Sequence, residues 1–247
     1  MVTFGFIVVL FLAQIFGLAR ASPLSIGLWI AVSALVLAIS LAFLPESGLG
    51  RPKPSSAKPK VRARFDPVLA LGLVMIALGR LAMAPINSFL TLYITEYLHS
   101  DTASLLWALA AIVEVPALIL AGRLVAKMGA MPVIALTTVA IVLRLALYAL
   151  VPTLTGALIG QLLHFFCYGL FLPASIAFVS SRVPPGRRAW GMALFTSLGI
   201  ALPSFIGSSI GGFVLESDGY PALFAWYTLP ALLSLAIYAT TARKFRA

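Results

Sequence analysis

The sequence is poor in charge, above all in acidic residues, and it contains a single cysteine. Only 10% of its 247 residues are charged, and 7 Asp and Glu stand against 17 Lys and Arg. A soluble domain carries roughly a quarter charged residues and about half apolar ones, whereas 62% of this chain is hydrophobic. Because so apolar a chain cannot hide its surface in one water-facing fold, we expect lipid to be its solvent.

Other absences exclude whole classes of function. The lone cysteine, Cys167, excludes an intramolecular disulfide and a cysteine-rich metal site. No Walker-type glycine loop and no His-Glu-x-x-His helix is present, which argues against ATP drive and against a metalloprotease. His164 and Cys167 lie in one apolar run without a third orienting group, and they are too few to hold a metal ion. We therefore expect no enzyme, no metal and no cofactor.

Long apolar runs separated by short polar breaks predict an all-α integral membrane protein with about eight transmembrane helices. About 20 helical residues cross the ~30 Å hydrocarbon layer, so each run is long enough, the first only marginally. The expected spans are 2–18, 23–44, 67–97, 103–124, 131–151, 155–179, 188–214 and 220–242.

The cations alternate between the two sides of this map. Fourteen of the 17 lie on one side, namely Arg51, Lys53, Lys58, Lys60, Arg62, Arg64, Arg123, Lys127, Arg182, Arg187, Arg188, Arg243, Lys244 and Arg246. The opposite loops hold Arg20 together with Glu96, Asp101, Glu216 and Asp218. Cation-rich short loops mark the cytoplasmic side, so we expect a multi-pass protein of the inner membrane with both termini in the cytoplasm. Cations confined to loops in this way are topology signals, so the net charge of +10 does not indicate a nucleic-acid partner.

Composition divides the chain into four parts. These are two helices in 1–44, a basic cytoplasmic linker in 45–66, a six-helix bundle in 67–242 and a cytoplasmic tail in 243–247. The linker is rich in Pro, Ser, Gly and cations, which is typical of flexible segments. Asp66 and Pro67 are expected to begin the next helix as its N-cap and first-turn proline. A cleaved signal peptide ending near Ala21 is the less favoured alternative for the first run, because no cation precedes it.

Four ionisable residues lie inside the apolar runs: Arg80, Glu114, Arg144 and His164. Such groups are costly in hydrocarbon and usually face a cavity, a partner or a substrate path. By helix rise, Glu114 and His164 lie about 15 Å below the outer surface and Arg144 about 10 Å. Low dielectric disfavours an ionised carboxylate and a nearby cation favours it, so a carboxylate at this depth can take up and release a proton. The structural alternative is a static pair of Glu114 with Arg144, and a His164 that only bonds a neighbouring helix.

Polar neighbours predict a lined cavity around these groups. Gln161, His164 and Tyr168 share one helix face, and Arg80, Asn87 and Thr91 share another. Plain hydrogen bonding between helices is the alternative. Small residues predict close helix approach at Gly156 with Gly160 and at Gly207 with Gly211, with Gly199 and Gly212 on the same run as the latter pair. Kinks are expected near Pro85, Pro116, Pro173, Pro203 and Pro230.

The loop Gly122-Arg123-Leu124-Val125-Ala126-Lys127-Met128-Gly129 resembles the cytoplasmic loop pattern G-x-L-x-D-R-x-G-R of the major facilitator superfamily (MFS). Gly122, Leu124, Lys127 and Gly129 fit the pattern, whereas Ala126 replaces its acid. Leu143-Arg144, followed twenty residues later by Leu163-His164, is similar to an arginine and a histidine on successive helices of the lactose permease. That likeness implies solute binding and proton coupling for Arg144 and His164. The permease's coupling glutamate corresponds to Cys167, so Glu114 becomes the better candidate proton carrier.

The chain is thus most similar to the phenylpropionate-permease-like and lactose-permease-like proton symporters. The resemblance implies helices five to twelve of a twelve-helix carrier, that is, a C-terminal six-helix bundle preceded by two helices of the N-terminal half. It further implies a proton symporter for a small organic solute, such as an aromatic acid, a sugar or a nucleoside, working by alternating access. Two alternatives stay open: a truncated, non-transporting membrane fragment, and a subunit whose cavity is completed by missing N-terminal helices on a second polypeptide.

Overall fold

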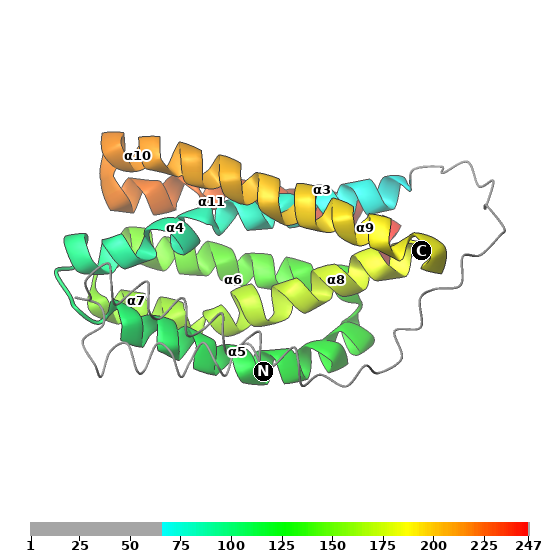
Figure 1. The fold of residues 1–247 in the computed structure, drawn as a ribbon, viewed down its shortest axis with the longest axis horizontal. Coiled ribbons are helices and arrows are strands. Elements are labelled where there is room, and N and C mark those ends of the chain that lie inside the picture. Colours follow the sequence, from blue (N-terminus) through cyan, green and yellow to red (C-terminus); the bar gives the residue numbers. More distant parts are fainter. Residues whose placement is uncertain (1–65, 247) are drawn as a thin grey trace, which may run out of the picture. The chain divides into compact units, whose positions relative to one another are not determined.

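The computed structural model describes residues 66–246, and all regular secondary structure in that range is helical (Figure 1). The expected helices at 2–18 and 23–44, and the linker as far as residue 65, lie outside the described residues. The α-helices are α3 (Pro67–Ala82), α4 (Ala84–Leu92), α5 (Ala103–Met128), α6 (Ala130–Leu150), α7 (Leu154–Leu162), α8 (Phe171–Arg182), α9 (Arg188–Leu194), α10 (Leu202–Trp226) and α11 (Thr228–Arg246). Short segments join them: the π-helices η2 (Tyr93–Tyr97), η3 (Phe165–Leu170) and η5 (Phe195–Ala201), and the 3-10 turn η4 (Pro185–Arg187).

Within the described part, five continuous helical stretches are long and apolar enough to cross a membrane. The longest runs for 61 residues from Pro185 to Phe245, and it is broken at Gly219. The backbone of Gly219 has φ 78° and ψ −179°, a conformation open essentially to glycine alone, so the chain reverses there. The two sides of this break correspond to the last two expected spans. The helices lie roughly side by side along their length (Figure 1).

The outer surface of the bundle is apolar, as lipid requires. Phe213 is 74% exposed, Phe205 71% and Ile119 68%. A water-soluble monomer rarely leaves so many large apolar side chains uncovered, whereas lipid chains solvate them without cost. The chain is therefore a multi-pass, all-α membrane protein.

Prolines follow breaks in the helices at four of the five expected places, one of them Pro230, which comes three residues after the break at Tyr227 between α10 and α11. The expected span 67–97 is split at Met83, two residues before Pro85, into α3 and α4. The π-helices η3 and η5 end shortly before Pro173 and Pro203. A proline cannot donate to the carbonyl four residues back and its ring crowds that carbonyl, so the preceding turn widens. Pro116, by contrast, lies inside α5 without a break in the assigned helix.

Small residues bring helices into close contact where expected. A Cβ added at Gly160 would meet the ring of Tyr148 on α6 at 2.3 Å, and one at Gly207 would meet Ala84 on α4 at 2.4 Å. Gly212, on the same helix as Gly207, faces open space instead. The stretch from Gly207 to Gly211 has the spelling of a Gly-x-Ser-x-Gly nucleophile elbow, but it lies inside α10 rather than at a strand-to-helix turn.

Helix α6 is the centre of the described bundle, since it contacts α3, α5, α7, α8, α10 and α11. At one end of the bundle an aromatic cluster joins η2, α6 and α10. Its members are Tyr93, Tyr97, Tyr148, Tyr220 and Phe224. Tyr220 also donates a hydrogen bond to Glu96 at 3.1 Å, which ties the reversed end of α10 to η2. The buried position of α6 then places the polar residues of its middle turns in the core.

Candidate functional site

The site is built around Arg144, the largest fully buried side chain of the described part, with 0% exposure. Its Nε donates to the Tyr148 hydroxyl at 3.0 Å, one turn further along α6. Its two terminal nitrogens reach α7 and the residue just before η3: Nη2 donates to Gln161 Oε1, and Nη1 lies 3.1 Å from His164 Nδ1. The guanidinium charge is thus spread over three polar partners in the apolar core, as buried charges require.

His164 stands between Arg144 and Glu114. Its Nε2 lies 3.6 Å from Glu114 Oε2 on α5, within ion-pair range. An arginine can only donate, so Nδ1 of His164 must accept from Arg144 and a neutral ring carries its proton on Nε2. That proton faces the Glu114 carboxylate. The alternative of a direct static pair between Glu114 and Arg144 is therefore wrong, because the Glu114 carboxylate contacts the intervening imidazole of His164 instead.

Tyr168 links this group to Arg80 on α3. The rings of His164 and Tyr168 are stacked, with centroids 5.0 Å apart and planes inclined by 6°. Arg80 donates from Nη1 to the Tyr168 hydroxyl and from Nε to Ser204 Oγ at 2.9 Å. Three helical segments distant in sequence are thereby joined through hydrogen bonds and ring contacts.

A cavity of about 180 Å³ opens beside these residues. Its walls are formed by Asn87, Trp107, Ala110, Ala111, Glu114, His164 and Tyr168. The Glu114 side chain is 22% exposed, whereas that of His164 is only 8% exposed, so the carboxylate is the more open of the two to the cavity. Thr91, which was expected to share a helix face with Arg80 and Asn87, accepts a hydrogen bond from Trp107 Nε1 at 3.0 Å.

All seven residues expected at the solute site fall in this region. Arg80, Glu114, Arg144, His164, Gln161 and Tyr168 form one run of contacts, and Asn87 lines the cavity. Gln161 Nε2 is buried and has no hydrogen-bond partner within the described part. This leaves one free donor next to the guanidinium group.

Sequence reasoning missed three residues of the site: Trp107, Tyr148 and Ser204. Two of them carry a signal in their spacing. Trp107 precedes Glu114 by seven residues, and Tyr148 follows Arg144 by four, so each shares a helix face with a residue already singled out. Ser204 has no such signal, because it reaches Arg80 from a helix 124 residues away.

The motif expected in a loop lies instead at the end of α5, away from the cavity, because Gly122 to Met128 are helical and only Gly129 stands between α5 and α6. Gly129 separates the two helices with φ 88°, which favours glycine, and Leu124 packs against the core. Lys127 is exposed. Gly122 is also exposed, and open space surrounds it, so the motif's first glycine permits no close contact in this structure.

The fold agrees with the relationships of the chain to known proteins. Residues 2–226 match the MFS_1 like family. The chain belongs to this family. It is 27% identical over 156 residues to the uncharacterized transporter YwbF of Bacillus subtilis (strain 168), a match that covers 63% of this chain and 38% of that protein. A solved structure of the nucleoside transporter NupG is similar with a TM-score of 0.74 at 20% identity, over 98% of this chain and 65% of that one.

The expected membership of the major facilitator superfamily is thereby confirmed. It spans about 38% of the length of YwbF and about 65% of that of NupG. At 20% identity the likeness to NupG establishes the fold alone.

Proposed function

We propose that this chain is a proton-coupled secondary transporter for a small organic solute, and that the cavity beside Glu114 is part of the solute path. The contact between Glu114 and His164 in the wall of that cavity carries the proposal. Titratable groups at membrane depth are expensive, and they occur where they face a partner or a watery path. Glu114 has a partner, His164, and also lines the cavity.

Glu114 is the proposed proton carrier. Protonation removes its charge and with it the attraction to the Nε2–H of His164, so the contact between α5 and the η3 end weakens. A solute that binds one arrangement of these helices better than the other is then linked to the proton, because each shifts the same equilibrium. We propose that the two arrangements open the cavity to opposite sides of the membrane as the helices rock around it, which is alternating access.

The cavity wall favours a solute with a flat ring and hydrogen-bonding groups. Trp107 and Tyr168 offer ring surfaces, and Asn87 offers both a donor and an acceptor. Aromatic acids, sugars and nucleosides all meet that description. Nucleosides are the first class to test, because NupG, which shares the fold, is a nucleoside transporter.

The test is uptake by the chain reconstituted in vesicles, with and without an inward proton gradient. The probes are uridine, phenylpropionate and lactose, one from each solute class. We expect a proton gradient to stimulate uptake of one probe, and Glu114→Gln to abolish that stimulation, because an amide cannot carry the proton. Glu96→Gln is the matched control, since Glu96 is an exposed carboxylate bonded by Tyr220 and lies outside the cavity wall.

Uptake that keeps its dependence on the gradient in Glu114→Gln would remove Glu114 from the mechanism. Binding is followed in parallel by the fluorescence of Trp107, which lines the cavity, with Trp107→Phe as the blank. Uptake by the chain alone supports the carrier. Binding without uptake supports the two alternatives, a non-transporting fragment or a subunit completed by a second polypeptide.

We further propose that the protein lies in the inner membrane with its cation-rich end in the cytoplasm. Arg123, Lys127, Arg182, Arg243 and Lys244 lie at the helix ends and connections of one end of the bundle. Glu96, Asp101, Glu216 and Asp218 lie at the other. This is the distribution that the positive-inside rule assigns to cytoplasm and exterior respectively.

A further inference from the structure

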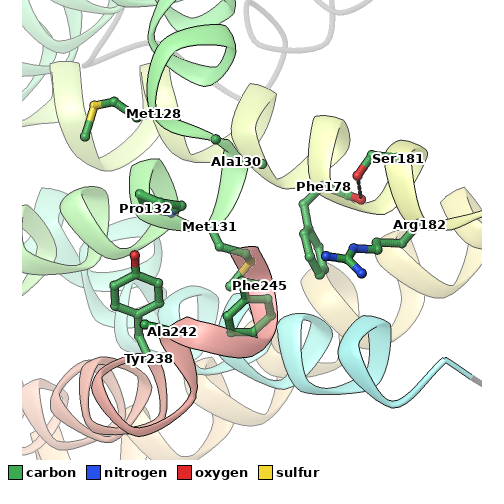
Figure 2. Close-up of a pocket in the computed structure, with 11 residues that line it drawn as sticks. Met128, Ala130, Met131, Pro132, Phe178, Ser181, Arg182, Tyr238, Ala242 and Phe245 are labelled. Atoms are coloured by element: carbon green, nitrogen blue, oxygen red, sulfur yellow. Dashed lines mark hydrogen bonds between the residues drawn. The ribbon is translucent and has the colours of Figure 1, made fainter. Parts of the chain in front are cut away.

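A second and larger hollow, of about 560 Å³, lies at the cation-rich end of the bundle. It is formed where α5 passes into α6 and where α8 and α11 end (Figure 2). The lining residues that matter here are Met131, Phe178, Ser181, Arg182, Tyr238 and Phe245. Its volume falls within the roughly 300–1,000 Å³ of small-molecule sites. The hollow is separate from the cavity at Glu114, and no residue lines both.

The wall of the hollow combines aromatic side chains with polar groups, and one cation lies at its edge. The rings of Phe178, Tyr238 and Phe245 pack against one another, with centroids 6.0 and 6.4 Å from that of Phe245. Figure 2 shows the guanidinium group of Arg182 turned back toward the ring of Phe178. Arg182 makes no hydrogen bond or ion pair within residues 66–246. An arginine that is half-buried beside aromatic rings and unpaired there is ready for an anion.

A second source of positive potential adds to this cation. Helix α6 begins at the hollow, and its N-cap, Gly129, supplies no side chain to bond the first N–H groups. Those of Ala130 and Met131 have no partner in the helix, and the helix dipole favours negative charge there. Ser181 is already committed, because its hydroxyl donates to the Phe178 carbonyl at 2.7 Å.

No acid offsets these charges. The sequence has no Asp or Glu between Glu114 and Glu216, and none after Asp218, so the segments that form the hollow contain cations alone. Asp66, the described carboxylate at this end, is occupied as the cap of α3, where it accepts from the Val68 N–H at 2.9 Å. The end of the bundle therefore attracts anions.

We propose that this hollow binds the head group of an anionic phospholipid from the adjoining leaflet. Its phosphate would lie on Arg182 and the start of α6, and the upper parts of its acyl chains would cover the half-buried rings of Tyr238 and Phe245. A lipid fits better than free phosphate, because one arginine and a helix start are few donors for a small dianion, whereas the half-buried rings of Tyr238 and Phe245 match the acyl chains. Lipid is also the solvent of the neighbouring surface.

The test is native mass spectrometry of the purified full chain, titrated with phosphatidylglycerol or with phosphatidylcholine. It measures the dissociation constant of the first lipid bound. We expect the chain to prefer phosphatidylglycerol, and Arg182→Gln to weaken the binding of that lipid by about fivefold, the effect of one cation at an anionic surface. Arg188→Gln is the matched control, because Arg188 is an exposed cation that follows η4 and does not line the hollow.

A second variant keeps every charge and fills the space instead. Ala242 lines the hollow from α11, so Ala242→Trp should exclude the lipid and lower the preference as Arg182→Gln does. Equal losses in Arg182→Gln and Arg188→Gln would mean general surface attraction and overturn the proposal. So would an unchanged preference in Arg182→Gln and Ala242→Trp together. Displacement of the lipid by millimolar inorganic phosphate would assign the hollow to free phosphate rather than to a lipid.

Discussion

Arg144 shows at the scale of one residue how a charge is kept inside a membrane bundle. The guanidinium group is fully buried, yet each of its nitrogens faces a different polar side chain. The plane of the group also lies over Tyr148, with Cζ 5.6 Å from the ring centroid. A planar fork with five donors can satisfy all these partners at once, which a lysine cannot do.

We therefore expect Arg144→Lys to lower the free energy of unfolding by about 1–3 kcal/mol, because Gln161 and Tyr148 lose partners that an ammonium group cannot reach together. Thermal unfolding of the purified chain in detergent measures the change. Tyr148→Phe is the companion variant, since it removes one hydroxyl contact and should cost only about 0.6 kcal/mol. An Arg144→Lys variant as stable as the original chain would show that the network around this position adds nothing to the fold.

At the scale of the helix, the irregular segments decide where the site residues lie. His164 immediately precedes η3, which contains Tyr168, and Ser204 follows η5. Both π-helices come before a proline, and a widened turn changes the direction of every side chain after it. The contacts of Arg80 with Tyr168 and Ser204 thus depend on irregularities in two helices other than its own.

The reversal at Gly219 supplies a sharp test at this scale. Gly219→Ala places a Cβ on a backbone with φ 78°, so we expect a loss of about 1–3 kcal/mol in the free energy of unfolding. Gly212→Ala is the matched control in the same helix, where open space meets the added methyl group and alanine favours helix. Thermal unfolding of both variants measures the difference. Equal stability would contradict the assigned backbone conformation at residue 219.

At the scale of the whole molecule, the charges separate to opposite ends of the bundle. We expect a cysteine at Ala189, in the cation-rich connection, to react with a membrane-impermeant maleimide from the cytoplasm only. A cysteine at Ser217, between Glu216 and Asp218, should react only from outside. Both sites are exposed. The native Cys167, which is buried, is replaced by serine in both variants, so that the introduced cysteine is the thiol that can react. Labelling of both positions from one face would contradict a membrane crossing between residues 189 and 217.

The helical crossings and the identity of the site residues were within reach of the sequence. A run of about 20 apolar residues meets the thickness of the bilayer whatever surrounds it, and a charge in such a run is costly wherever it stands. The length of an apolar run and the presence of a charge within it are properties of one short segment, so the sequence reveals them without knowledge of the surrounding helices. Arg80, Glu114, Arg144 and His164 were singled out on this ground, and the structure brings all four into one run of contacts. Their role in transport stays a prediction.

The order of those contacts was decided only by the tertiary structure. That His164 separates Glu114 from Arg144, that Tyr168 bridges to Arg80, and that a hollow opens beside Arg182 could not be derived from spacing. These features depend on how each helix is rotated and how closely it approaches its neighbours. Rotation and approach are set by π turns before prolines and by small residues packed against another helix, which act between segments far apart in the chain.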